Sequence, residues 1–435
     1  MAAARNEGEE RRGTAGALRR LQRMLGPGLI TGAADDDPAG VTTYLQAGAQ
    51  FRFGLLWTVL FQLPLMSAVQ LMCARIGRAS GSDLAGVLAK HYPRPVLWGA
   101  AVILLFSNTV TAAADLAAVA EALHILTGVA ALVFVVPVAA GLVTLVALLR
   151  YEPLRQLLKW TTLALFAFVV AAFLASPGWG HVLRATIVPE IRLTRDYLYM
   201  FVAVFGTTIS PYLFFWQAAE ELEEEKAAGR NTVAQRRGTS RRILRMIRAD
   251  TLVGMTVSQL ICYFVMVSGA AALFATGHRS IHTAAEAALS LQPLGGGLGT
   301  VLFCIGFIGT GLLAIPTLTG GASYVLAALF RWRTGIGEKP SGAPGFYAAM
   351  GAITLLAAVL DFAGLSPVQL LVGSAVLSGL LAPPLLGIIL HVANDEEIMA
   401  GHTNGWLLNG LGIVTTAIMG LSAVALVVQL IHGGA

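Results

Sequence analysis

The sequence predicts an all-α protein that crosses a membrane many times, and three observations support this. Of its 435 residues, 56% are hydrophobic and only 12% are charged, about half the roughly 25% charged residues of soluble proteins. Long apolar runs fill most of the chain, which has a mean hydropathy of +0.72. Lys and Arg gather between these runs. The net charge of +5 therefore reflects membrane topology, and neither a water-soluble enzyme nor a nucleic-acid-binding protein is predicted.

A helix needs about 20 apolar residues to cross about 30 Å of hydrocarbon, and eleven stretches approach or exceed this length. Residues 1–20 are polar and form a predicted mobile tail, while 21–435 form a single transmembrane domain. Cys73, Cys262 and Cys304 lie in apolar runs and are interpreted as buried small hydrophobic residues. The predicted spans are 21–50, 53–77, 95–127, 130–149, 158–175, 196–222, 248–275, 298–330, 345–362, 366–393 and 405–431.

The distribution of basic residues predicts the orientation. With the amino terminus inside, 24 of the 29 Lys and Arg residues lie on the inner side, where such residues are enriched. We therefore expect a multi-pass protein of the cell membrane with a cytoplasmic amino terminus and an external carboxyl terminus. The charged segment 220–248 is interpreted as a solvated inner loop, with binding of anionic lipid or of a regulator as the alternative.

Two of the predicted spans contain helix-breaking residues. In the first span, Asp35, Asp36, Asp37, Pro38 and Gly40 fall near the middle of the apolar stretch. An Asp at a helix centre costs about 2.5–3.5 kcal/mol, so three of them must face a cavity, a cation or one another. The proline removes a helical hydrogen bond and, with the glycine, favours local unwinding.

The sixth span is interrupted by Gly206-Thr207-Thr208-Ile209-Ser210-Pro211. The two interrupted spans occupy matching positions in two five-helix units, about 21–176 and 196–393, which are followed by an extra helix at 405–431. Each unit has five spans, and because this number is odd, the second unit begins on the opposite side of the membrane and is inverted relative to the first. Interrupted helices in inverted repeats indicate a substrate site near the middle of the bilayer, as in the five-plus-five leucine-transporter architecture.

Three motifs resemble the natural-resistance-associated macrophage protein (Nramp) family of divalent metal transporters: GPGLITGAADDDPAG, DLAAVAEAL and LLAPPLLGIILHVANDEEIMAG. The resemblance covers about 410 residues. It implies binding of Mn²⁺ or Fe²⁺ with proton co-transport, through Asp-Pro-Gly-Asn in the first helix and Met-Pro-His in the sixth.

The sequence departs from this family pattern at several positions. Asp37 and Pro38 match, but Gly40 replaces the asparagine, and Ile209 and Pro211 stand at the methionine and histidine positions. Two further family residues, the tenth-helix glutamine and a third-span glutamate, become Ala375 and Ala118. A roomy site rich in carboxylates and without sulfur suits hydrated Mg²⁺, and Asp36 resembles the extra aspartate of the Nramp-related magnesium transporters.

We therefore expect import of Mg²⁺ without tight proton coupling. A divalent ion gains about 4.6 kcal/mol on entering at about 100 mV, twice the value for one charge. Asp37 is the predicted principal metal carboxylate and Asp36 the second, while Gln217 hydrogen-bonds metal waters or merely packs. The family resemblance implies a backbone ligand, which we place among free carbonyls around Gly206. The predicted site-lining residues are Gly40, Thr207, Ile209, Ser210 and Pro211, and the candidate pathway residues are Asp35, Asn108, Asp115, Glu220 and Glu221.

Other functions remain open at this point. One is a proton-coupled Mn²⁺/Fe²⁺ importer whose soft ligand lies elsewhere, with Met200 and Met255 available. An organic-solute symporter on the same fold would place a substrate carboxylate at a helix end, which the three aspartates oppose. An enzyme is not expected, because the sequence contains neither a His-Glu-x-x-His nor a Gly-x-Ser-x-Gly motif. The expected partners are a divalent metal ion, as substrate and not as cofactor, and the lipid bilayer, and a monomer is compatible with the sequence.

Overall fold

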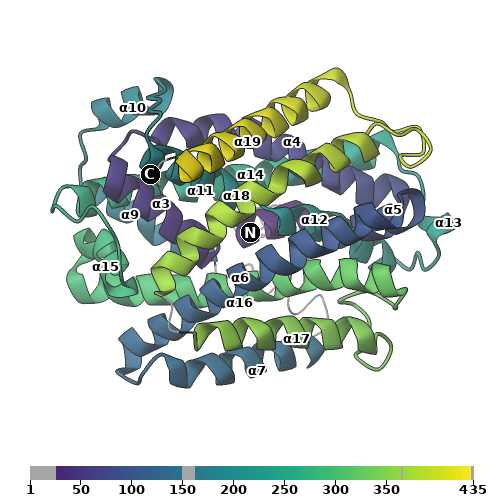
Figure 1. The fold of residues 1–435 in the computed structure, drawn as a ribbon, viewed down its shortest axis with the longest axis horizontal. Helices are drawn as coiled ribbons and strands as arrows, with labels where there is room; N and C mark the ends of the chain where they lie inside the picture. The colour runs from purple at the N-terminus through teal and green to yellow at the C-terminus, as the bar shows by residue number, and fades with distance from the viewer. Residues whose placement is uncertain (1–25, 149–161, 364–365, 433–435) are drawn as a thin grey trace, which may run out of the picture.

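The computed structural model describes residues 26–148, 162–363 and 366–432, and all regular structure in these ranges is helical. Figure 1 shows that the long helices lie side by side, roughly along the longest axis of the molecule. The first unit contains α2 (Pro27–Asp35), α3 (Pro38–Phe51), α4 (Leu56–Ser80), α5 (Leu84–His91), α6 (Arg94–Thr127), α7 (Leu132–Leu148), η1 (Thr162–Leu165), α9 (Phe166–Leu174) and α10 (Trp179–Ile187).

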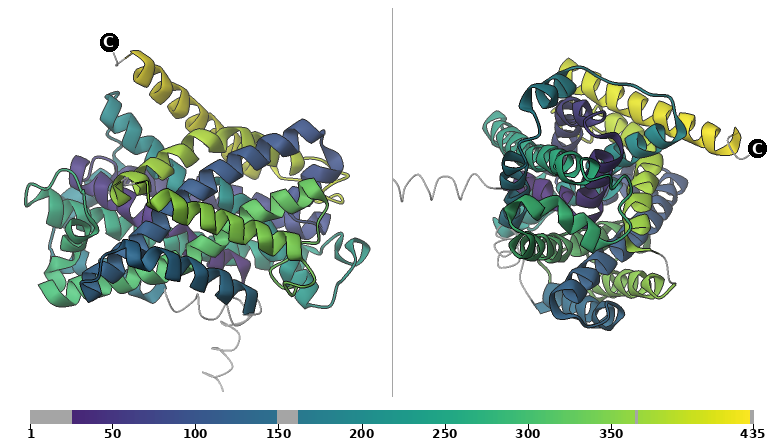
Figure 2. Two further views of the ribbon diagram at one scale, coloured as in Figure 1. Left: turned by 60° about the horizontal axis from the view of Figure 1, so that its bottom comes forward. Right: turned by 90° about the vertical axis from the view of Figure 1, so that its left-hand side faces the viewer.

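The second unit begins with the other interrupted span. It contains α11 (Arg195–Thr208), α12 (Pro211–Ala227), α13 (Val233–Arg236), α14 (Arg241–Ser268), η2 (Gly269–Phe274), α15 (Ala284–Ala288), η3 (Leu289–Leu294), α16 (Gly296–Phe330), α17 (Pro344–Asp361) and α18 (Pro367–Val392). The extra helix α19 (Trp406–His432) follows. In Figure 2 it leans away from the bundle, and many of its apolar residues, such as Leu421 and Val424, are exposed, as expected for a surface that faces lipid.

Eight helices of the described part are long and apolar enough to cross a membrane. The predicted first span is absent from these eight because it is divided into helices of 9 and 14 residues. The fourth predicted span is the 17-residue α7. The predicted tail, residues 21–25 of the first span and the basic segment 150–159 lie outside the described residues.

The fifth predicted span, 158–175, differs from its expected form. Its described part ends at Leu174, and after a sharp bend of 118° the chain continues as α10. No helix was predicted at 179–187, where Val182 is the buried residue that anchors α10 to the core. This helix was missed because 9 residues are too few to cross the membrane, so it did not meet the criterion for a span.

Proline explains both helix interruptions. Pro38 and Pro211 occupy the first turn of α3 and α12, where the missing N–H is not needed. The residue before a proline is driven out of the helical region, and Asp37 and Ser210 accordingly have extended backbones, with ψ of 167° and 139°. The two predicted breaks are therefore confirmed, at Asp36–Asp37 and at Ile209–Ser210.

Helix α2 is held against α14 by close backbone packing and by one carboxylate. A Cβ at Gly32 would overlap the backbone of Gly254, so only glycine allows the two helices to approach this closely. Asp250 of α14 accepts hydrogen bonds from the backbone N–H groups of Gly26 and Gly28, at 2.8 and 2.7 Å. These N–H groups lack partners within α2, so Asp250 fixes the start of α2.

The interpretation of 220–248 as a solvated loop is wrong for its acidic half, whereas most residues from 227 onwards are exposed. Helix α12 continues to Ala227 and α14 begins at Arg241. Glu225 is 1% exposed and forms ion pairs with Arg78 at 2.7 Å and with Arg230 at 2.5 Å. The acidic half of the segment is thus a buried, ion-paired helix end that joins α12 to α4, a feature that charge counting does not reveal.

Candidate functional site

The three aspartates at the first interruption are buried but point in different directions. Asp35 ends α2, Asp36 follows it with φ −85° and ψ 45°, and Asp37 is the N-cap of α3. Their side chains are only 1–2% exposed. Asp35 and Asp36 face α14, whereas Asp37 turns towards α12. The unwound residues therefore present carboxylates to two separate places.

Asp37 stands at a point where oxygen atoms from three segments converge. Its Oδ1 accepts from the N–H of Gly40 at 2.5 Å, and its Oδ2 lies 3.3 Å from the hydroxyl of Tyr212. A Cβ at Gly40 would lie 3.0 Å from Thr207 Oγ1 and 3.1 Å from both Asp35 O and Asp37 Oδ1. These three oxygen atoms therefore gather closely around Gly40, and we call them the oxygen cradle.

The second interruption contributes less than expected. Ser210 donates back to the carbonyl oxygens of Gly206 and Thr207, at 2.6 and 2.7 Å, so the carbonyl of Gly206 is not free, contrary to the sequence-based prediction. Ile209 is fully buried and shares a hydrophobic cluster with Met255, and Pro211 begins α12. Of the predicted lining residues, Gly40 and Thr207 are at the oxygen cradle, and Ser210 caps the end of α11.

Asp35 and Asp36 contact two side chains of α14. Ser258 Oγ lies 2.6 Å from Asp35 Oδ2 and 3.2 Å from Asp36 Oδ1. Cys262 Sγ lies 3.2 Å from the same Asp36 oxygen, so the interpretation of this cysteine as a mere buried hydrophobic residue is incomplete. Among the described residues, none of the hydrogen-bond partners of the three aspartates is Lys or Arg.

The candidate pathway residues of α6 support the interrupted helices. Asp115 Oδ1 accepts from the N–H of Ala39 at 3.1 Å, which satisfies a donor in the first turn of α3. Asn108 donates to the carbonyl of Leu318 at 2.8 Å. Both residues are fully buried, and their observed contacts hold α6 to α3 and α16.

Three further residues predicted to take part in metal binding or in the pathway lie on α12, beyond the interruption. Gln217 is fully buried, and within the described part of the chain its side-chain oxygen and nitrogen have no hydrogen-bond partner. Glu221 lies 3.8 Å from Arg78 and lines a cavity of about 540 Å³ with residues of α14. Glu220 is buried and does not line this cavity.

Three contact residues of the site were missed in the sequence. The hydroxyl of Tyr212 donates to the carbonyl oxygen of Ala34 at 2.8 Å, one of the carbonyls that lack a helical partner because α2 ends at Asp35. Ser258 and Cys262 are four residues apart and therefore share one face of α14, but only the fold brings that face to Asp35 and Asp36. The polar i,i+4 pair within an apolar helix was the available signal.

A family model decides where this chain belongs. The model described as "Natural resistance-associated macrophage protein-like" matches residues 28–429. The chain belongs to the Nramp family. It is therefore a multi-pass membrane transporter and not an enzyme. A curated Nramp relative is the divalent metal cation transporter MntH of Yersinia enterocolitica, 26% identical over 411 residues, which cover 93% of this chain and 94% of the relative.

Solved structures agree with this Nramp fold. The manganese transporter of Eremococcus coleocola superposes with a TM-score of 0.73 at 18% identity, covering 93% of this chain and 86% of that one. Mhp1, a nucleobase-cation-symport-1 family transporter, superposes with a TM-score of 0.54 at 13% identity, covering 93% and 91% of the two chains. These likenesses confirm the predicted all-α fold of the leucine-transporter type.

Proposed function

We propose that this Nramp chain carries divalent metal ions across the membrane through the oxygen cradle. The observation that carries this proposal is the gathering of Thr207 Oγ1, Asp35 O and Asp37 Oδ1 around Gly40. Hard divalent cations are bound by carboxylate, carbonyl and water oxygens. The cradle joins the two interrupted helices, so an ion held there contacts elements of both repeats.

Mn²⁺ is the first candidate substrate. The curated relative is named a divalent metal cation transporter and the structural neighbour a manganese transporter, which favours Mn²⁺ over the Mg²⁺ expected from sequence. The expectation of Mg²⁺ also assumed a site without sulfur, whereas Cys262 contacts Asp36. Mg²⁺ remains the second candidate, because the cradle offers only oxygen and the methionine position holds Ile209.

For the driving force, we propose uptake down the membrane potential without tight proton coupling. Pro211 stands where the family has a histidine, and Asp115 already accepts a backbone hydrogen bond. A divalent ion that enters a cell at about 100 mV, negative inside, gains about 4.6 kcal/mol, which allows more than a thousandfold accumulation. The excess of basic residues on one side of the predicted spans supports an amino terminus on the inside of the cell.

Uptake into proteoliposomes tests these proposals together. Mn²⁺ and Mg²⁺ are supplied separately under an imposed inside-negative potential while internal pH is recorded, and protease cleavage of the 228–240 segment identifies the orientation of the protein. We expect Mn²⁺ uptake that rises with the potential and leaves internal pH unchanged. Uptake of Mg²⁺ but not Mn²⁺ would reverse the order of the substrates, acidification driven by Mn²⁺ would contradict uncoupled transport, and uptake of neither ion would refute metal transport.

A further inference from the structure

We propose that Asp35, Asp36 and Cys262 form a second cation subsite, beside the oxygen cradle, that takes soft or borderline divalent ions such as Cd²⁺ and Co²⁺. This proposal rests on the proposed function, because it assigns the preference among metal ions to a particular sulfur atom. We call the three residues the sulfur subsite.

The geometry suits a single ion. One ligand atom from each of the three residues lies within 4.8 Å of the other two. Metal–sulfur bonds of about 2.3 Å and metal–oxygen bonds of about 2.0–2.2 Å span ligand separations up to about 4.5 Å. Small side-chain rotations therefore bring all three atoms onto one ion. Ser258, which contacts both carboxylates, holds the two aspartates beside the thiol.

Unpaired oxygen atoms provide a second, separate indication of a ligand. Asp35 Oδ1 and Asp36 Oδ2 are buried and have no hydrogen-bond partner within the described part of the chain, and the two side chains are 98–99% buried. Buried polar atoms almost always have partners, and adjacent carboxylates in a membrane interior require a positive counter-charge. A bound cation satisfies both requirements at once.

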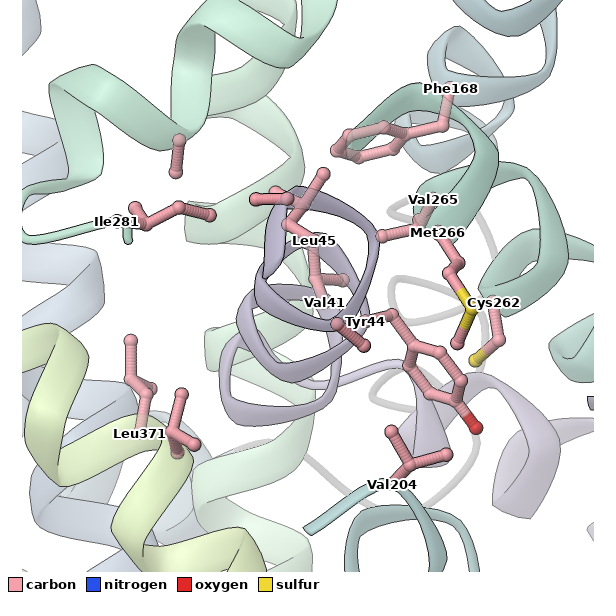
Figure 3. Close-up of a cluster of buried hydrophobic side chains, with 14 of the residues drawn as sticks. Val41, Tyr44, Leu45, Phe168, Val204, Cys262, Val265, Met266, Ile281 and Leu371 are labelled. Atoms are coloured by element: carbon pink, nitrogen blue, oxygen red, sulfur yellow. The ribbon is translucent and has the colours of Figure 1, made fainter. Parts of the chain in front are cut away.

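The sulfur atom of the proposed subsite belongs to α14, whereas the methionine of the family pattern belongs to the sixth span. Figure 3 shows the sulfur of Cys262 and the hydroxyl of Tyr44 on the same side of α3, close to one another. A thiolate favours softer ions over Mg²⁺ and Ca²⁺, and the thiol proton is released to solvent when the metal–sulfur bond forms. Cys262 on α14 thus compensates for the thioether that is absent at Ile209.

Equilibrium binding of Cd²⁺ to the purified full-length protein tests the sulfur subsite. Cadmium thiolate bonds produce an ultraviolet charge-transfer absorption, which is followed during titration, with affinity measured by calorimetry. We expect the absorption in the wild type, its loss in Cys262→Ser, and an affinity for Cd²⁺ at least about tenfold lower in this variant. Cys73→Ser is the matched control, because Cys73 is also a buried cysteine of a long helix, and it should retain both signals.

Two further measurements complete the test: Cd²⁺ binding by Asp36→Asn and Mn²⁺ transport by the wild-type protein. Asp36→Asn preserves shape and leaves the thiol in place, so a lowered Cd²⁺ affinity in this variant supports the subsite even if Cys262→Ser fails to fold. Retention of the absorption in Cys262→Ser, or its equal loss in Cys73→Ser, would refute the subsite. Wild-type protein that transports Mn²⁺ but shows no cadmium thiolate absorption would contradict the subsite alone, while absorption without transport would contradict only the proposed function.

Discussion

Replacing Asp37 with alanine is expected to lower Mn²⁺ uptake by at least about 100-fold. Changes to residues that only support a metal ligand already cost about 10–100-fold in affinity or activity, and Asp37 supplies the carboxylate oxygen of the oxygen cradle. The measurement is the initial rate of uptake into proteoliposomes, with the amount of folded protein determined by size-exclusion chromatography.

A second carboxylate provides the control for this loss. Asp361 is also largely buried, but it ends α17, on the other side of α6 and α16 from α3. Asp361→Ala should therefore retain nearly wild-type uptake. Retained uptake in Asp37→Ala, with Asp361→Ala unchanged, would show that the ion binds elsewhere.

Replacing Gly206 with valine is expected to destabilise the protein by about 3 kcal/mol or more. A Cβ at this position would overlap the carbonyl oxygen of Ala375 and the backbone of Gly379 on α18. Overpacking typically costs about 1–3 kcal/mol, and backbone atoms yield less readily than side chains. The midpoint of thermal unfolding in detergent and the yield of monodisperse protein measure the effect.

Gly373 allows a matched comparison on α18 itself. Within the described part of the chain, no atom beyond the adjacent backbone of α18 lies within 4 Å of a Cβ built at this glycine, so Gly373→Val should lower the unfolding midpoint far less than Gly206→Val. An equal effect of the two substitutions would mean that loss of backbone flexibility, and not the close approach of α11 to α18, determines the result.

The two helix interruptions could be predicted because their cause is local. Pro38 and Pro211 act on their own backbone and on the preceding residue, so the sequence alone locates both breaks within about two residues. The helix ends formed by these breaks then require partners. Asp115, which bonds to the N–H of Ala39, was identified as a candidate because it is an acid within a span.

The partners across the site could not be predicted in the same way. Ser258 and Cys262 meet Asp36 only because Gly32 and Gly254 bring α2 close to α14, which is a property of packing and not of periodicity. The burial of Glu225 escaped prediction for a similar reason. Its charge is balanced by Arg78 and Arg230, and a hydropathy profile does not reveal such ion pairs.

The most direct test of the central claim is to locate Mn²⁺ by anomalous X-ray scattering in crystals of the wild-type protein. We predict the strongest anomalous peak beside Gly40, within bonding distance of Asp37 Oδ1 and close to Thr207 Oγ1 and the carbonyl oxygen of Asp35. A strongest peak at the acidic end of α12 near Glu221, or no peak at saturating Mn²⁺, would contradict the assignment of the oxygen cradle as the transport site.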